Sequence, residues 1–253
     1  MGNTVLSVRD GQFFVNERET YTDVSPDAPA RGLLLNARFI QGVFDDLNGR
    51  ERYARFGFDR FDPEENTDRL IAALPAWHDH GLLGFTVGFQ GGGPCFTIDN
   101  ATVQTNPFGE DGRRRDPHYA ARMDRLIRAA DALGMVVIVS LFYPAQACRF
   151  QDDLAVVDAV QTGAGFVRDG GYTNVILEVA NEHDLTAGCG RKHPQIVTVD
   201  GMVSLIGMAR EIAGVPTGCS RSGGSVDPDI CRASDVLLIH GNGCSRQGLY
   251  RII

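Results

Sequence analysis

The sequence predicts an α/β protein built around a parallel sheet, and two observations support this expectation. Strand-like apolar runs recur along the chain, and segments with apolar residues at helical spacing lie between them. The runs are almost continuously apolar, which is typical of strands covered on both faces. They occupy residues 33–44, 82–89, 135–143, 175–180 and 236–240, with a weaker run at 215–221.

The chain opens with a short strand and turn at residues 11–16, from which we expect an N-terminal β-hairpin. Residues 22–30 carry prolines and small polar residues, which is typical of a loop. We therefore divide the chain into a hairpin and loop over residues 1–30 and one β/α-barrel domain over residues 31–253.

The segments between the strands have the periodicity of amphipathic helices. Leu70, Leu74 and Trp77 share one face of the first segment, and Gly134 follows the second segment as a helix-ending residue. The expected helices cover residues 67–80, 117–133, 153–167 and 199–212. Strands that alternate with helices form right-handed β-α-β units, which place the strands in parallel.

Two architectures fit such a sheet, a doubly wound open sheet and a (β/α)₈ barrel of the TIM-barrel type. A dinucleotide-binding open sheet would carry Gly-x-Gly-x-x-Gly after its first strand, and this sequence has no such motif. The glycine run at residues 91–93 lacks the Lys-Ser/Thr of a phosphate-binding loop. The sequence therefore favours the barrel.

Polar residues follow the strand-like runs, at the end where a barrel places its active site. They are Asp45, Gln90, Tyr143, Asn181, Glu182, His240 and Asn242. The alternative interpretation is that these residues are polar only because loops are polar. Their presence after five different runs favours a site.

Asn181-Glu182 directly follows the run at residues 175–180 and is the most informative of these pairs. A carboxyl group at that position can donate a proton to a leaving oxygen, and the neighbouring amide can hold a hydroxyl group. The alternative is that the pair caps a helix, because Asn suits the N-cap and Glu suits the first turn.

Two strand ends, Val179-Ala180-Asn181-Glu182 and Ile239-His240-Gly241-Asn242, resemble those of the clan A glycoside hydrolases, especially the cellulase-like family 5. The resemblance implies a (β/α)₈ barrel that cleaves O-glycosidic bonds by a retaining two-carboxylate mechanism. It implies Glu182 as the general acid/base. It also implies that Asn181 binds a substrate hydroxyl and that His240 orients the second carboxylate or binds the sugar.

Polar side chains at other strand ends can bind or stack on the sugar, and the candidates for substrate binding are Gln90, Tyr143, Asp45 and Asn242. At strands 2 and 3 the chain departs from family 5, which often carries an Arg and a His there, so its substrate subsite is either different or not used for that chemistry. The resemblance also implies a nucleophilic glutamate on a seventh strand, whereas we count six strand-like runs. We therefore expect an incomplete barrel with six of eight strands, which keeps the acid/base and lacks the nucleophile. An unclosed sheet has open edges, so we expect the chain to self-associate.

Two other functions stay open. A barrel without catalysis could bind a carbohydrate or serve as a scaffold. A metal-dependent hydrolase is less favoured: His183, Asp184, Cys189 and His193 lie close together in the sequence, but their spacing matches no standard zinc pattern. We expect no metal and no cofactor. Lys192 is the only lysine and lies in a glycine-rich loop, which argues against Schiff-base and pyridoxal-phosphate chemistry.

Bulk properties limit the partners and the compartment. The net charge of −8 and the pI near 5.2 argue against nucleic acid or an anionic membrane as a partner. No apolar stretch approaches the roughly 20 residues that span a bilayer. The six cysteines are widely spaced without a CxxC pair, so we expect reduced thiols in a cytoplasmic protein.

Overall fold

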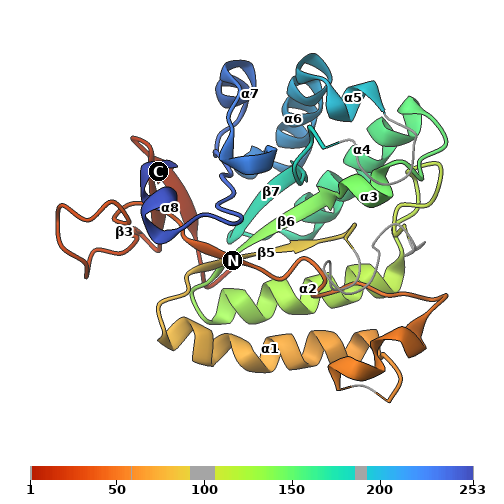
Figure 1. The fold of residues 1–253 in the computed structure, drawn as a ribbon, viewed down its shortest axis with the longest axis horizontal. Coiled ribbons are helices and arrows are strands. Elements are labelled where there is room, and N and C mark those ends of the chain that lie inside the picture. Colours follow the sequence, from red (N-terminus) through yellow and green to blue (C-terminus); the bar gives the residue numbers. More distant parts are fainter. Residues whose placement is uncertain (1, 58, 92–105, 186–192, 253) are drawn as a thin grey trace.

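The computed structural model describes residues 2–57, 59–91, 106–185 and 193–252, and these form two sheets and a set of helices (Figure 1). The first sheet is antiparallel and contains β1 (Leu6–Arg9), β2 (Gln12–Val15) and β3 (Arg18–Glu19) in that order. It confirms the N-terminal hairpin and adds a short third strand.

The second sheet is parallel and its strands are adjacent in sequence order. They are β4 (Asn36–Arg38), β5 (Gly84–Gly88), β6 (Val136–Phe142), β7 (Val175–Ala180) and β8 (Thr217–Gly218). Of the expected sixth strand, only a single parallel bridge forms, between Ser220 and Leu238. The order is that of a barrel opened between its last and first strands, which confirms an incomplete barrel, with five strands and one bridge instead of six strands.

The helices of the described ranges follow the strands in the expected alternation. They are α1 (Pro63–Asp79), α2 (Pro117–Ala132), α3 (Pro144–Ala147), α4 (Asp153–Gly170), α5 (Pro194–Val197), α6 (Val199–Ala213), α7 (Pro228–Ala233) and α8 (Arg246–Ile252), with 3₁₀ turns at Arg50–Phe56 and Ser222–Gly224. In Figure 1, α1 and α2 lie together on one side of the parallel sheet, and α4 and α6 lie together on the other.

Local chemistry explains where several helices begin and end. Asp62, Asp116 and Asp227 each accept hydrogen bonds from the first turn of the helix that follows, and a proline occupies the first helical position each time. Helices α4 and α6 end at Gly171 and Gly214, whose φ angles of 62° and 67° favour glycine.

The parallel sheet has one face toward the helices and one toward the interior. Val137 and Val139 of β6 join the large core formed with the helices, whereas Val136 and Ile138 point to the opposite face. That second face is covered by the N-terminal hairpin, through Leu6, Val8, Phe13 and Val15. The hairpin thus fills the apolar end of the open barrel.

Hydrogen bonds fix the start of the hairpin near the beginning of β7. The Leu6 amide donates to the Thr173 carbonyl at 2.9 Å, and the Thr173 hydroxyl donates to the Thr4 carbonyl at 2.6 Å. The Asp131 carboxylate accepts from the amides of Asn3 and Thr4 at 2.9 and 2.8 Å. Residues 1–30 therefore pack as part of the barrel's base, and their separation as a domain stays a prediction.

The covering role of the hairpin gives a stability prediction. Phe13→Ser is expected to lower the free energy of unfolding by about 2–3 kcal/mol, because it removes a half-buried ring from the interior face. Phe14→Ser is the matched control. Phe14 lies on the same strand, but the Arg9 guanidinium lies 4.3 Å from the centroid of its ring. This substitution should lower the free energy of unfolding by less than about 1 kcal/mol. Urea unfolding measures both, and equal losses would contradict the assignment of faces.

Two findings concern membrane-spanning helices and the thiols. Within the described ranges, the structure contains no helix both long and apolar enough to cross a membrane. Cys148 is disulfide-bonded, so the expectation of reduced thiols is wrong for this cysteine. Cys219, Cys231 and Cys244 are free, and Cys95 and Cys189 lie outside the described residues.

Candidate active site

The site begins where β7 ends. The Asn181 amide donates to the Phe142 carbonyl of β6 at 2.9 Å, and the Ser220 amide donates to the Ala180 carbonyl at 3.2 Å. These two bonds carry the sheet one step past β7 and fix the position of Asn181. Glu182 then turns sharply, with φ at 44°, in the left-handed region that costs energy for a residue other than glycine.

The helix-cap interpretation of Asn181-Glu182 is wrong, because residues 181–184 form a turn. The Glu182 amide donates to the Ser220 hydroxyl at 2.9 Å, and the His183 amide donates to the Ser220 carbonyl at 3.1 Å. The next helix of the described residues, α5, begins only at Pro194.

The Glu182 carboxylate is held on one side and open on the other. Its Oε1 atom accepts from His240 Nδ1 at 2.9 Å and from Asn242 Nδ2 at 3.3 Å. Its Oε2 atom forms no hydrogen bond with the described residues, and the side chain is 15% exposed. Oε2 is therefore the oxygen that the described residues leave without a hydrogen bond.

An arginine that the sequence analysis did not single out completes the group. Arg38, the last residue of β4, contacts His240 Nε2 through NH1 at 2.7 Å and donates through NH2 to Asn181 Oδ1. Because a guanidinium only donates, His240 Nε2 accepts, and the ring proton lies on Nδ1, facing Glu182. The same NH1 atom also lies 3.0 Å from His240 Nδ1. No hydrogen bond forms there in this tautomer, because Nδ1 carries the ring proton.

Four of the expected site residues thus lie in one hydrogen-bonded group with Arg38. They are Asn181, Glu182, His240 and Asn242. The group joins the ends of β4 and β7 to the run at residues 236–240, so side chains connect the first and last strand positions of the open sheet.

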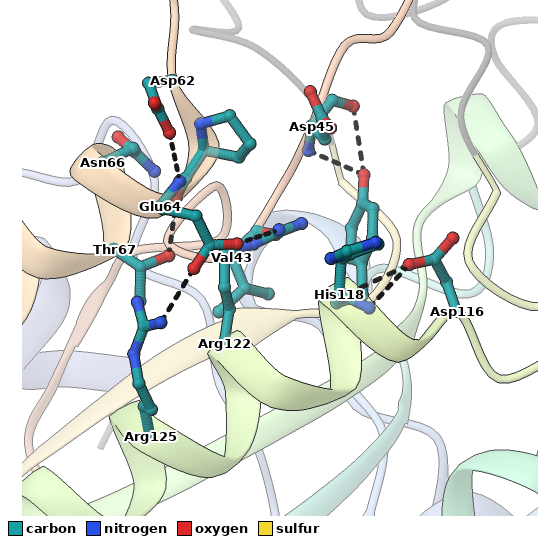
Figure 2. A network of polar contacts seen from close by, with 12 residues as sticks. Val43, Asp45, Asp62, Glu64, Asn66, Thr67, Asp116, His118, Arg122 and Arg125 are labelled. Carbon is teal, nitrogen blue, oxygen red and sulfur yellow. Dashed lines mark hydrogen bonds and ion pairs between the residues drawn. The ribbon is translucent and has the colours of Figure 1, made fainter.

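Asp45 lies outside this group. The expected strand over residues 33–44 ends at Arg38, so Asp45 lies in the loop beyond it. Its carboxylate accepts from Arg50 at 3.0 and 2.7 Å, and these hydrogen bonds raise the pKa of the Arg50 guanidinium. Its backbone contacts the Tyr119 hydroxyl on α2 (Figure 2).

A neighbouring buried arginine shows that this region joins α1 to α2. Arg122 donates to the Glu64 carboxylate at 2.7 Å and to the Val43 carbonyl at 3.1 Å, and Arg125 reaches the same carboxylate at 2.8 Å (Figure 2). Burial of Glu64 opposes its ionisation, but the two arginines outweigh it and lower the pKa of Glu64. Asp45 belongs to this structural region, and its role in sugar binding stays a prediction without support from the geometry.

Gln90 and Tyr143 also lie outside the group. The buried Gln90 side chain accepts from the Tyr143 amide at 3.0 Å and donates to Asn106 Oδ1 at 3.2 Å. It joins the loops that follow β5 and β6. The stacking or binding of sugar by Tyr143 and Gln90 therefore stays a prediction, and the amide of Gln90 is already occupied.

The candidate metal ligands are held in separate contacts. His183 contacts the Ile196 carbonyl through Nδ1 at 3.0 Å, and burial lowers its pKa. Asp184 accepts twice from Ser222, at 2.9 and 2.8 Å; burial opposes its ionisation, but these bonds outweigh it and lower the pKa of Asp184. His193 contacts Asp153 at 2.8 Å.

Cys189, the fourth candidate ligand, lies outside the described residues. Among the residues that are described, no three His, Cys, Asp or Glu side chains form a group that could hold a metal ion. The metal-dependent alternative has no support from this part of the chain.

No family model matches the sequence, and no curated protein matches it. Solved structures do match the fold. An endo-1,4-β-mannanase from Eisenia fetida has a TM-score of 0.51 at 14% identity over 89% of this chain. A protein assigned as a glycoside hydrolase from Bacteroides vulgatus has a TM-score of 0.56 at 13% identity over 90%. The β-mannanase of the blue mussel Mytilus edulis has a TM-score of 0.50 at 11% identity over 92%.

These matches show that the fold is that of the barrel-type glycoside hydrolases, in agreement with the resemblance to clan A. The chain spans 64%, 41% and 70% of the three structures, in the same order. It therefore corresponds to a part of each of those proteins.

Proposed function

We propose that this chain carries the acid/base half of a retaining glycosidase site that acts on O-glycosidic bonds. One observation supports the proposal most strongly: Glu182 lies at the end of β7 with Oε1 held by His240 and Asn242 and Oε2 open. The barrel fold shared with glycoside hydrolases supports the same class of substrate, a carbohydrate.

Each side chain of the group has a role in this mechanism. Glu182 Oε2 holds a proton and donates it to the glycosidic oxygen as the bond to the sugar breaks. The carboxylate that results is stabilised by the N–H group of His240, and it later accepts a proton from water. Arg38 donates to the side-chain oxygen of Asn181, Oδ1, which leaves the side-chain NH₂ group of Asn181 to bind a sugar hydroxyl.

A retaining mechanism needs a second carboxylate about 5–5.5 Å from the first. The resemblance implies that this carboxylate comes from a seventh strand, and the parallel sheet of the described residues has five strands and one bridge. Glu178 lies on the same strand, but its side chain is buried in the barrel interior and its Oε1 atom accepts from the Ser220 hydroxyl. We propose that the nucleophile is missing from this chain.

An external nucleophile tests the proposal. We expect slow or undetectable hydrolysis of phenyl mannosides and glucosides by the chain alone, and turnover to glycosyl azide when sodium azide replaces the missing carboxylate. Mannosides come first because two similar folds belong to mannanases. Rapid hydrolysis without azide would show that the nucleophile is present.

A non-catalytic carbohydrate-binding barrel is the alternative. It predicts that manno-oligosaccharides bind, as measured by calorimetry, but that azide supports no turnover. Glu182→Gln would then leave both the affinity and the absence of turnover unchanged. Neither nucleic acid nor a membrane is proposed as a partner, in keeping with the net charge of −8.

Self-association through the open sheet edge is a further prediction. Within the described residues β4 pairs with β5 alone, so its other edge offers unpaired backbone groups. We expect light scattering after size exclusion to show dimers or larger species at micromolar concentration. A monodisperse monomer would contradict this expectation.

A cytoplasmic location depends on reduced thiols and stays a proposal. The disulfide at Cys148 weighs against it, because disulfides persist mainly in oxidising compartments. Cell fractionation would settle the location.

A further inference from the structure

A second glutamate lies beneath the site and has no part in the proposed chemistry. Glu178 is four residues before Glu182 in β7, with its side chain in the barrel interior. Burying a carboxylate in this way is costly unless it is hydrogen-bonded. Its Oε1 atom accepts from the Ser220 hydroxyl at 2.6 Å, and its Oε2 atom has no partner in the described part of the chain.

Ser220 connects this buried carboxylate to the backbone of Glu182. It follows β8 and is completely buried. Its hydroxyl donates to Glu178 and accepts from the Glu182 amide at 2.9 Å. Its backbone amide donates to the Ala180 carbonyl, and its backbone carbonyl accepts from the His183 amide. Ser220 therefore holds the turn on both sides of Glu182.

The direction of the Ser220 hydroxyl depends on Glu178. A serine O–H group rotates to suit its partners, whereas a backbone N–H group only donates. Because the Glu182 N–H group occupies a lone pair of the Ser220 oxygen, the hydroxyl hydrogen is directed to the other neighbour, Glu178 Oε1. Glu178 thus provides the acceptor that keeps the Ser220 hydroxyl in this orientation.

The backbone that these contacts hold is the strained one. A non-glycine residue with φ at 44° persists only where its surroundings determine it. In the described residues, the Ser220 hydroxyl is the side chain that bonds the Glu182 backbone. Loss of this bond is therefore expected to let the turn relax and to move the Glu182 carboxylate away from His240.

We infer that Ser220 and Glu178 are positioning residues that hold the acid/base carboxylate in its reactive orientation. This inference rests on the proposed function of Glu182. Neither residue touches the substrate, since both are buried below the turn.

Ser220→Ala tests the inference with two readouts. The first is hydrogen exchange of the Glu182 amide, followed by NMR, which should become at least about 10-fold faster. The second is azide-supported turnover, in which kcat should fall by about 10- to 100-fold while KM changes less than about 2-fold, because misplacement of a reacting group lowers the rate without removing binding contacts. Ser220→Thr keeps the hydroxyl and should restore both.

Ser140→Ala is the matched control. Ser140 is a buried serine on the neighbouring strand β6, paired in register with Glu178, and its hydroxyl has no hydrogen-bond partner among the described residues. Both readouts should stay at the wild-type values. Glu178→Gln, which weakens the bond to Ser220 without removing the acceptor, should lower kcat by about 3- to 10-fold and decides the matter if Ser220→Ala does not fold.

The inference is overturned if Ser220→Ala leaves the exchange of the Glu182 amide unchanged, or if Ser140→Ala lowers kcat as much as Ser220→Ala. Failure of the proposed function looks different. In that case wild-type protein shows no azide-supported turnover, while Ser220→Ala still accelerates exchange of the Glu182 amide.

Discussion

Azide-supported cleavage of a phenyl glycoside is expected to fall by about 10²- to 10⁴-fold when Glu182 is replaced by glutamine. Glutamine keeps an oxygen that can accept from His240 and Asn242, so the group retains its geometry. It has no acidic proton to give to the leaving phenoxide, which is a poor leaving group without protonation. The rate of phenol release measures the effect.

Asp45→Asn is the control for this variant, because Asp45 is the other carboxylate that the sequence placed at the site. Its carboxylate is paired with Arg50 in the loop after β4 and lies outside the Glu182 group. We expect a turnover rate within about 2-fold of wild type. A loss as large as that of Glu182→Gln would mean that Asp45 takes part in the chemistry.

Arg38→Met should lower the same rate by about 10- to 100-fold, because misplacement of reacting groups alone can cost that much. Methionine keeps an unbranched apolar stem but has no donors, so Asn181 Oδ1 and His240 Nε2 both lose their partner. The His240 ring is then free to adopt its other tautomer or to rotate from Glu182. Arg38→Lys should recover only part of the rate, since an ammonium group lacks the planar fork that reaches both side chains.

The matched control for Arg38 is Arg50→Met, which removes an arginine from the loop that follows the same strand. Arg50 pairs with Asp45 and has no contact with the Glu182 group in the described residues. Its kinetics should match wild type, although its unfolding midpoint can fall. Equal kinetic losses in both variants would show that the effect is general destabilisation of this region.

The sequence was sufficient for the alternation of strands and helices, because each buried run is apolar and each helix has an amphipathic face. It did not predict the end of β4. Residues beyond Arg38 are apolar for a reason other than strand pairing: Phe39 stacks on Trp77 at 4.5 Å between ring centroids, and Val43 is fully buried. Because these apolar loop residues continue the strand-like pattern, the pattern does not mark Arg38 as the end of the strand and places Asp45 there instead.

The candidate site was predictable in part, because the sequence marks the ends of two short apolar runs well. The residues at or just after these ends are Glu182, Asn181, His240 and Asn242. Gln90 has the same pattern, but its amide is used to join two loops, and only the structure shows this. The run at residues 236–240 forms only one bridge, between Ser220 and Leu238. On its other side no strand of the described residues pairs with it, so nothing there extends it into a full strand.

The dependence of the Glu182→Gln effect on the leaving group tests the acid role of Glu182 most directly. A 2,4-dinitrophenolate leaves without protonation, whereas a phenolate needs it. We predict that, in azide, wild type and Glu182→Gln cleave the 2,4-dinitrophenyl glycoside at rates within about 10-fold of each other but differ by about 10²- to 10⁴-fold on the phenyl glycoside. An equal loss on both substrates would contradict a role of Glu182 as the general acid.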